Sequence, residues 1–314
     1  MNKQELMLGL LDETKKQEYI PAGFFLHFDP EYQQGQAAVD KHLEFFRYTG
    51  MDFVKIQYET RFPHVPEIKT LNDWDKMPLY KRDFFENQLS IADGLVRAAH
   101  DDALVIMTLY SPFMCAAHAT SSDLITGHMK EAPEKVIKGM EIVTDSLMLF
   151  VKECIKLGVD GFYTSTQGGE SRRLGGDPAI FGQCVKPFDL ALMNEINRHC
   201  IFNILHVCDY HGSYSSFDMF LDYPGHVVNC NPELESGTLT GQEISQLFNR
   251  PFMGGLDRKG IIVTGSEADI TKTVVDVLKE APEKFILAAD CTVPSDINWN
   301  NLRTAITTAH EFRR

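Results

Sequence analysis

Three residues in the second half of the chain have the side chains and the spacing to bind one metal ion. His206 and Cys208 are two residues apart in the segment LHVCD, and Cys291 follows the segment AAD. If LHVCD is a strand, its period of two places His206 and Cys208 on one face, where their side chains converge. Two thiolates and one imidazole form a zinc site that keeps a fourth position open. The pattern therefore predicts a Zn²⁺ site at His206, Cys208 and Cys291.

An ordinary structural explanation competes with this one, because buried cysteines are most often small core residues. The third ligand, at the end of the last expected strand, is what favours a metal site over that explanation. Asp209 directly follows the pair. It either orients His206 through the second ring nitrogen or is a simple loop carboxylate.

Further polar residues stand where expected strands end. The candidate catalytic carboxylates are Glu59 and Asp257. The candidate substrate-binding residues are His27, Gln167, Glu170 and Asn229. Arg172 and Arg173 are the cations best placed to hold an acidic substrate tail, with a solvated loop as the alternative. For His27 the alternative is a structural histidine, and for Gln167 and Glu170 it is a plain turn.

The elements that must position these side chains alternate along the chain. Runs of β-branched and aromatic residues predict strands over 23–28, 53–58, 104–110, 161–166, 202–208, 226–231, 252–257 and 285–291. Helical patterns predict helices over 36–48, 83–99, 134–157, 187–199, 241–248, 266–280 and 298–312. Unbroken alternation indicates parallel βαβ units. We therefore expect a single (β/α)8 TIM barrel over residues 1–314, with a doubly wound open sheet as the alternative, and the site at the carboxyl ends of the strands.

The composition excludes several classes of partner. The formal net charge of −14 argues against binding to nucleic acid or to an anionic membrane surface, since both need a basic surface. The chain contains no apolar run of about 18 residues, the length of a membrane-spanning helix. Its charged N-terminal sequence lacks the apolar core of a signal peptide. We expect a cytoplasmic protein with reduced thiols; the oligomeric state stays open, with a homodimer as one option.

Several stretches of the chain are similar to one known family. These stretches are DPEY at 29–32, YSPFMCAAH at 110–118, GVDGFYTSTQGG at 158–169, ILHVCD at 204–209 and DCTVPSDINWNNLRTAI at 290–306. Through them the chain resembles the uroporphyrinogen decarboxylase superfamily over most of its length. One branch of that superfamily comprises decarboxylases without a metal or cofactor. The other comprises zinc-dependent methyltransferases, such as the methylcobamide:coenzyme M enzymes, which take a methyl group from a corrinoid protein.

The resemblance to the methyltransferase branch is residue by residue at His206, Cys208 and Cys291. It implies a zinc-dependent enzyme that activates a small thiol to accept a methyl group from a corrinoid protein. The decarboxylase branch carries an arginine-rich segment after its first strand, which binds the carboxylates of its substrate. The corresponding stretch here, FFLHFDPEYQQGQ, contains no arginine. Glu59 falls about where the decarboxylases carry their catalytic aspartate.

Two other functions stay open. A metal-independent carboxy-lyase of porphyrin metabolism, similar to uroporphyrinogen decarboxylase but acting on a smaller or less acidic substrate, would use Glu59 or Asp257 as its acid or base. A barrel that only binds a corrinoid or another tetrapyrrole is the non-catalytic alternative, against which the open metal position argues. Metal content separates the methyltransferase from the carboxy-lyase, and turnover with a thiol separates it from the binding protein.

Overall fold

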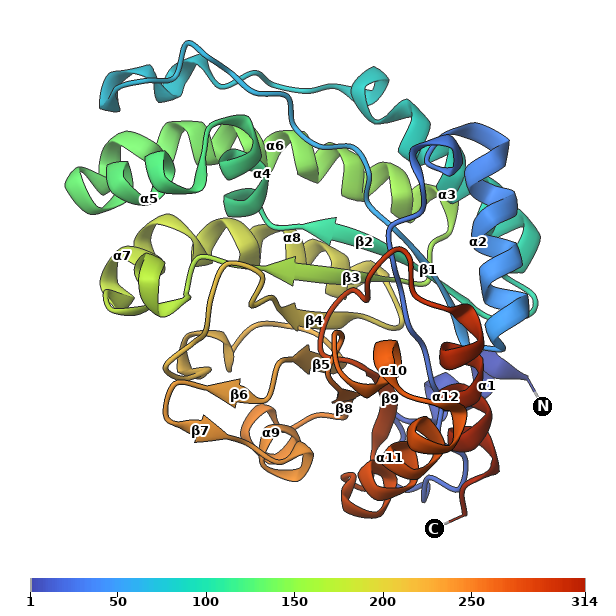
Figure 1. The fold of residues 1–314 in the computed structure, drawn as a ribbon. Helices are drawn as coiled ribbons and strands as arrows, with labels where there is room; N and C mark the ends of the chain where they lie inside the picture. Colours follow the sequence, from blue (N-terminus) through green and yellow to red (C-terminus); the bar gives the residue numbers. More distant parts are fainter. Residues whose placement is uncertain (1, 314) are drawn as a thin grey trace.

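A curled parallel sheet forms the centre of the structure, a computed structural model that describes residues 2–313 (Figure 1). Its strands, in the order in which they pair, are β1 (Phe53–Ile56), β2 (Leu104–Tyr110), β3 (Gly161–Thr166), β4 (Ile204–Val207), β5 (Val227–Cys230), β8 (Phe252–Leu256) and β9 (Phe285–Ala289). A separate antiparallel hairpin of β6 (Glu233–Leu234) and β7 (Gly237–Thr238) follows β5. Seven of the expected strands are therefore confirmed, several of them one to three residues shorter.

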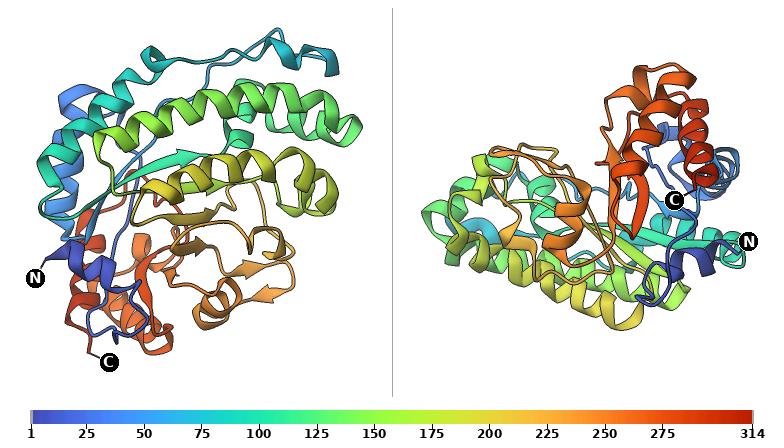
Figure 2. Two further views of the ribbon diagram at one scale, coloured as in Figure 1. Left: turned by 180° about the vertical axis from the view of Figure 1, so that it is seen from behind. Right: turned by 90° about the horizontal axis from the view of Figure 1, so that it is seen from below.

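Helices connect the strands and cover the outside of the sheet (Figure 2). The helices expected from the sequence are present as α2 (Gly35–Thr49), α3 (Glu86–Ala99), α6 (Pro133–Leu157), α8 (Lys186–His199), α9 (Gly241–Phe248), α11 (Glu267–Glu280) and α12 (Trp299–Glu311). The additional helices are α1 (Lys3–Gly9), α4 (Pro112–Ala119), α5 (Ser122–Glu131), α7 (Pro178–Cys184) and α10 (Ile261–Thr264). Within residues 2–313, no helix has both the length and the apolar character needed to cross a membrane.

The expected closed barrel is not formed, because segment 23–28 does not become an eighth strand. This segment lies between β9 and β1, but only one parallel bridge, from Ala22 to Leu287, joins it to the sheet. A longer strand would need more backbone hydrogen bonds to β9 and β1, but some of the backbone groups involved have no N–H or are bonded to a side chain. Pro21 has no N–H to donate, and the N–H of Gln57, just after β1, donates to the Nε2 atom of His42 at 3.3 Å. The architecture is a seven-stranded curled sheet of the α/β class, open where the barrel would close.

The first helix fills the amino-terminal end of the curled sheet. Met7 and Leu10 are buried there in one cluster with Phe53, Leu104 and Phe202, which begin or precede three of the strands. Burying side chains of this size contributes roughly 1.5–3 kcal/mol each. With this end packed, polar side chains gather at the carboxyl ends of the strands.

A buried carboxylate joins the end of β3 to α8. The Oδ2 atom of Asp189 accepts hydrogen bonds from Thr166 Oγ1 at 2.5 Å and from the Tyr223 hydroxyl at 3.1 Å. Its Oδ1 atom has no hydrogen-bond partner among the described residues. Burial raises the pKa of Asp189 to about 7, against the opposing effect of the two hydrogen bonds. The turn that starts after Thr166 is thus held by a group that ionises near neutral pH.

This carboxylate makes the stability of the protein depend on pH. The pKa of Asp189 is higher in the folded chain than the value of about 3.9 expected when unfolded. Its stabilising contribution is therefore complete below about pH 4 and is lost as the pH rises through 7. In urea unfolding, we expect Asp189→Asn to reduce the stability loss between pH 5 and pH 8 by roughly 1–3 kcal/mol. The control Asp145→Asn, at an exposed position of α6, should keep the wild-type dependence; an unchanged pH dependence in Asp189→Asn would contradict the assignment.

Candidate metal centre

The carboxyl ends of β4 and β9 bring together the three predicted metal ligands. The ligand atoms of His206, Cys208 and Cys291 all lie within 4.8 Å of one another, and the three residues are buried. The Sγ atom of Cys291 lies 3.4 Å from the Nε2 atom of His206. In the sheet, β5 and β8 separate β4 from β9. The curl of the sheet therefore creates the cluster, and the predicted grouping of these residues is confirmed.

The ring of His206 is fixed by a backbone carbonyl and by an aromatic ring. Its Nδ1 atom lies 3.3 Å from the carbonyl oxygen of Asn229, and the ring of Tyr163 stacks on it at 4.9 Å between centroids. A proton on Nδ1 that points to this carbonyl leaves the Nε2 lone pair free for a metal. The Asn229 side chain is buried, accepts from the Tyr163 hydroxyl at 2.6 Å and donates to Met253 and Ala289 carbonyls. The sequence predicts that Asn229 binds substrate, but its side chain bonds to groups of the protein directly below the cluster.

The two thiols form an asymmetric pair. The hydrogen bond with Cys291, together with burial, raises the pKa of Cys208 well above the usual value of a thiol. The same bond lowers the pKa of Cys291 against the effect of burial, with help from the charge of Arg258. Gln167 also donates from Nε2 to the Cys208 sulfur at 3.2 Å. Without a metal, Cys291 is therefore the sulfur that ionises first, and Cys208 holds the proton.

This donor set fits zinc. Thiolate sulfur and imidazole nitrogen are the ligands that zinc prefers, and three of them leave one tetrahedral position for another group. With Nδ1 directed at the Asn229 carbonyl, Nε2 is the His206 atom that would bind the ion. His206, Cys208 and Cys291 are the residues that would hold the ion.

One arginine, not identified from the sequence, connects the segments that carry the two cysteines. The Arg258 guanidinium donates to both carboxylate oxygens of Asp209, at 2.7 and 3.2 Å, and to Asp290 at 2.9 Å. Burial opposes the ionisation of Asp209, but the bonds from Arg258 and Asn231 outweigh it and keep its pKa below the usual value. Asp209 therefore pairs with Arg258 and does not orient His206. The group that contacts His206 Nδ1 is the backbone carbonyl of Asn229. A cation in GGLDRKG with an aspartate beside each cysteine was the signal available in the sequence.

The Gly-Gly turn after β3 is held by its own ion pair. Glu170 is fully buried, accepts from the Gly168 N–H at 2.7 Å and pairs with Arg173 at 3.3 Å. Arg173 also donates to the Oε1 atom of Gln167 at 3.0 Å, which orients the amide toward Cys208. The guanidinium of Arg173 is therefore occupied by partners within the protein, and Glu170 stabilises the turn instead of facing a substrate.

Of the remaining predicted residues, Glu59 and His27 form a pair, and Asp257 lies in a separate turn. The Oε1 atom of Glu59 and the Nδ1 atom of His27 are 2.8 Å apart, and both side chains are only partly buried. Asp257 is exposed and accepts a hydrogen bond from the Lys259 N–H at 2.8 Å within its own turn. The catalytic roles of Glu59 and Asp257 stay predictions.

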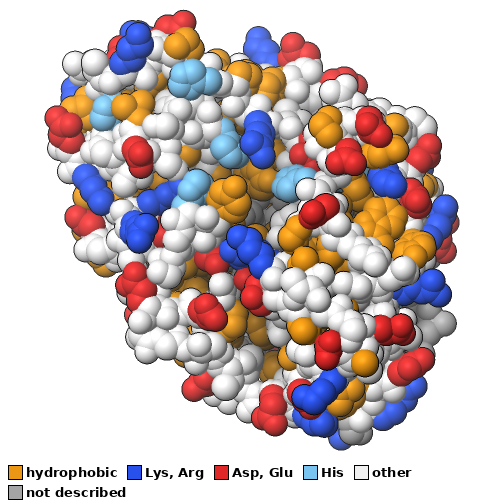
Figure 3. Space-filling model, in the orientation of Figure 1, with side chains coloured by type: hydrophobic (Ala, Val, Ile, Leu, Met, Phe, Trp, Pro, Cys, Tyr) orange, Lys and Arg blue, Asp and Glu red, His pale blue; other side chains and the backbone are white. Residues whose placement is uncertain are grey.

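Basic side chains surround a hollow on the face of the molecule shown in Figure 3. Around the site, Arg61 and His211 lie close enough to His118 for their charges to reinforce the effect of burial, which lowers the pKa of His118 to about 4. The Nδ1 atom of His118 is buried and lacks a hydrogen-bond partner among the described groups. Burial also raises the pKa of Tyr110, and the charges of Glu59 and Cys208 act on it in the same direction.

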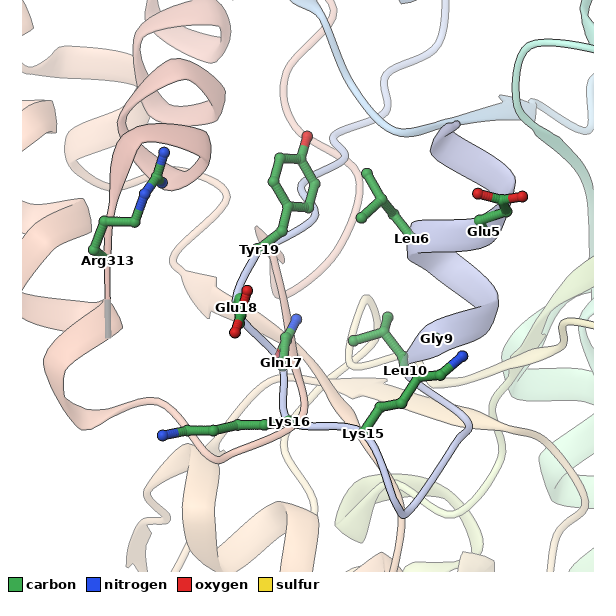
Figure 4. Close-up of a pocket in the computed structure, with 10 residues that line it drawn as sticks. All are labelled: Glu5, Leu6, Gly9, Leu10, Lys15, Lys16, Gln17, Glu18, Tyr19 and Arg313. Atoms are coloured by element: carbon green, nitrogen blue, oxygen red, sulfur yellow. The ribbon is translucent and has the colours of Figure 1, made fainter. Parts of the chain in front are cut away.

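One surface cavity lies away from this site. It has a volume of about 410 Å³ and is lined by α1, by the segment around Lys15 and Tyr19, and by Arg313 (Figure 4). These elements lie at the amino-terminal end of the sheet, where no ligand of the metal cluster is found. The chemistry of the donor set, and not cavity size, identifies the candidate site.

Comparisons with known proteins agree with this fold. The sequence model of the family "Uroporphyrinogen decarboxylase (URO-D)" matches residues 48–312. No curated protein sequence matches the chain. A methyltransferase from Methanosarcina mazei is similar in structure, with a TM-score of 0.81, 12% sequence identity and 99% of each chain covered. A B12-independent methionine synthase from Shewanella sp. W3-18-1 has a TM-score of 0.54 and 13% identity, covering 94% of this chain and 95% of its own.

The metal content of the purified protein tests the cluster. We expect close to one zinc per chain by mass spectrometry, and loss of most of it in Cys208→Ala and in Cys291→Ala. Removing one of three ligands should weaken zinc binding by more than about 100-fold. Cys230→Ala, which changes a buried thiol at the end of neighbouring β5, should lose stability only. Full zinc retention in both ligand variants would place the metal elsewhere.

Proposed function

The chain belongs to the uroporphyrinogen decarboxylase family, and from that premise we propose that it is a zinc-dependent methyltransferase. It activates a small thiol, which accepts a methyl group from a corrinoid protein. The observation that carries the proposal is the buried set of His206, Cys208 and Cys291 at the carboxyl ends of the strands. A decarboxylase acting without a metal has no use for two thiols and an imidazole brought within 4.8 Å of one another.

Zinc, when bound, supplies Lewis acidity that lowers the pKa of a thiol in its open position. The chain supplies the rest of the site. Cys208 and Cys291 offset the charge of the ion, so that thiol binding is favoured over activation of water. Gln167, held by Arg173, faces the sulfur of Cys208 and limits its movement.

Methyl transfer requires a place for the thiol proton. The bond between the methyl carbon and its donor breaks as the carbon–sulfur bond forms, and the electron pair of the broken bond stays with the donor. The thiol loses its proton when it binds; Glu59, whose partly exposed carboxylate is paired with His27 at 2.8 Å, accepts that proton and passes it to solvent. The charges of both Glu59 and Cys208 act on Tyr110, so the carboxylate and the metal ligand both lie near this ring.

The direction of approach follows from the burial of the ligands. α1 blocks the amino-terminal end of the sheet, so the donor must reach the cluster from the carboxyl ends of the strands. A bulky corrinoid held by its own protein suits this arrangement, because only the methyl group has to enter. The similar fold of a methyltransferase from Methanosarcina mazei supports the same reaction class.

The carboxy-lyase alternative is less well supported. Segment 24–36 contains no arginine, and Arg173 is buried against Glu170 and Gln167. Few cations are left for a substrate with many carboxylates, although Arg61 and Arg172 stay exposed.

Thiol binding tests the methyltransferase directly. A free thiol has a pKa near 8.5, so at pH 7 it is almost fully protonated. If it binds as the thiolate, mixing with the zinc-loaded protein should release close to one proton per chain, and X-ray absorption should detect one additional sulfur neighbour. We expect this with at least one of coenzyme M, homocysteine and 2-mercaptoethanol, followed by methylation with methylcobalamin as the donor.

Cys208→Ala and Cys291→Ala, treated in the same way, are the controls and should release no proton. If zinc is present in the wild-type protein but none of the thiols releases a proton or adds a sulfur, the metal is structural and the proposed reaction is wrong.

The decarboxylase alternative has its own assay. Incubated anaerobically with uroporphyrinogen, the protein should form no coproporphyrinogen above the rate of the heat-treated sample, because the arginine-rich segment is missing. Robust conversion would favour the carboxy-lyase; in that case Glu59→Gln should reduce kcat, and removing the metal should have no effect.

A further inference from the structure

Arg258 is the one residue in the described chain whose side chain contacts both aspartates that adjoin the cysteine ligands. Asp209 directly follows Cys208, and Asp290 directly precedes Cys291. The guanidinium donates to Asp209 at 2.7 and 3.2 Å and to Asp290 at 2.9 Å. The backbone N–H of Arg258 donates to the second oxygen of Asp290 at 2.7 Å. All three side chains are largely buried, with exposed fractions of 15% or less.

This contact crosses the part of the sheet where the cysteine segments are not directly connected. β4 and β9 share no backbone hydrogen bonds, since β5 and β8 lie between them. Arg258 follows β8 and reaches both segments, and Asn231, after β5, donates to Asp209 at 2.8 Å. The ends of all four strands are thus tied by side chains at the level of the metal cluster.

Electrostatics explain why this position needs a cation. Two carboxylates and two thiols lie close together in a largely buried region, and their charges repel one another when ionised. Removing the cation would leave Asp209 and Asp290 without compensation, which is costly for buried carboxylates. Repulsion between the two carboxylates would favour movement of their segments apart, and this would also separate Cys208 from Cys291.

We propose that Arg258 is a positioning residue that holds Cys208 and Cys291 at chelating distance before the metal binds. This inference rests on the proposed function for its purpose, because it concerns the same metal ligands. An arginine suits the role better than a lysine, since its fixed planar fork can serve two carboxylates at once. The energetic benefit is preorganisation: the ion meets ligands that already stand together.

Arg258→Met and Arg258→Lys test the proposal, with Arg250→Met as the matched control. Arg250 precedes the same strand β8, is partly buried and donates to the backbone carbonyls of Phe248, Gly225 and Tyr223. Two binding constants are measured for each folded variant: zinc by competition with a chelator, and phenylarsine oxide with the metal-free protein. The arsenical bridges two neighbouring thiols, so it reports their spacing without any zinc.

We expect Arg258→Met to weaken both constants by about 10- to 100-fold and Arg258→Lys to recover part of the loss. Arg250→Met should change neither constant by more than about twofold, because Arg250 donates to backbone carbonyls of other segments and not to Asp209 or Asp290. Wild-type values in Arg258→Met would overturn the proposal, and so would equal losses in Arg250→Met.

If Arg258→Met does not fold, Asp209→Asn, which replaces a charged acceptor of Arg258, should show the same two losses. A wild-type protein that binds the arsenical but not zinc would refute the metal function, while loss of the arsenical in Arg258→Met would still support the positioning role.

Discussion

The structure depends on holding two buried sulfur atoms and one imidazole together on strands that are not neighbours. Thiols in a buried region resist ionisation and repel each other once charged, so the surrounding chain must impose the arrangement. The curl of the sheet brings the ends of β4 and β9 within reach. The contacts of Arg258 to Asp209 and Asp290 then tie the two segments. Without the curl of the sheet, Cys291 would lie apart from His206 and Cys208.

A rigid polar layer lies directly beneath the cluster. Tyr163 stacks on His206 and bonds to Asn229, and the amide of Asn229 donates to the backbone at two strand ends. Lys55 is buried under the Tyr163 ring, and burial lowers its pKa to about 7. The orientation of the imidazole therefore follows from the packing of the strands, so that a ligand needs little rearrangement at this position.

Positive charge is distributed unevenly around the candidate site. The segment between β9 and β1 carries no arginine and packs aromatic and aliphatic residues instead, among them Phe24 and Leu26. The same segment fails to form a strand, so the sheet remains open at this edge. Basic residues lie near His118, where the charges of Arg61 and His211 add to the effect of burial and lower its pKa. Under the proposed function, substrate binding uses the candidate metal ligands and these few cations.

The sequence by itself determined the alternation of strands and helices and the three ligands, because the period of LHVCD and the position of Cys291 after the last strand are local properties. It could not determine whether segment 23–28 completes a barrel, since this depends on which groups take the backbone hydrogen bonds of Gln57 and its neighbours. The partners of charged residues were equally out of reach. Arg258 pairs with Asp209, which is 49 positions away in the sequence, and Arg173 bonds to Gln167 in the neighbouring turn. Only the folded chain determines these partners.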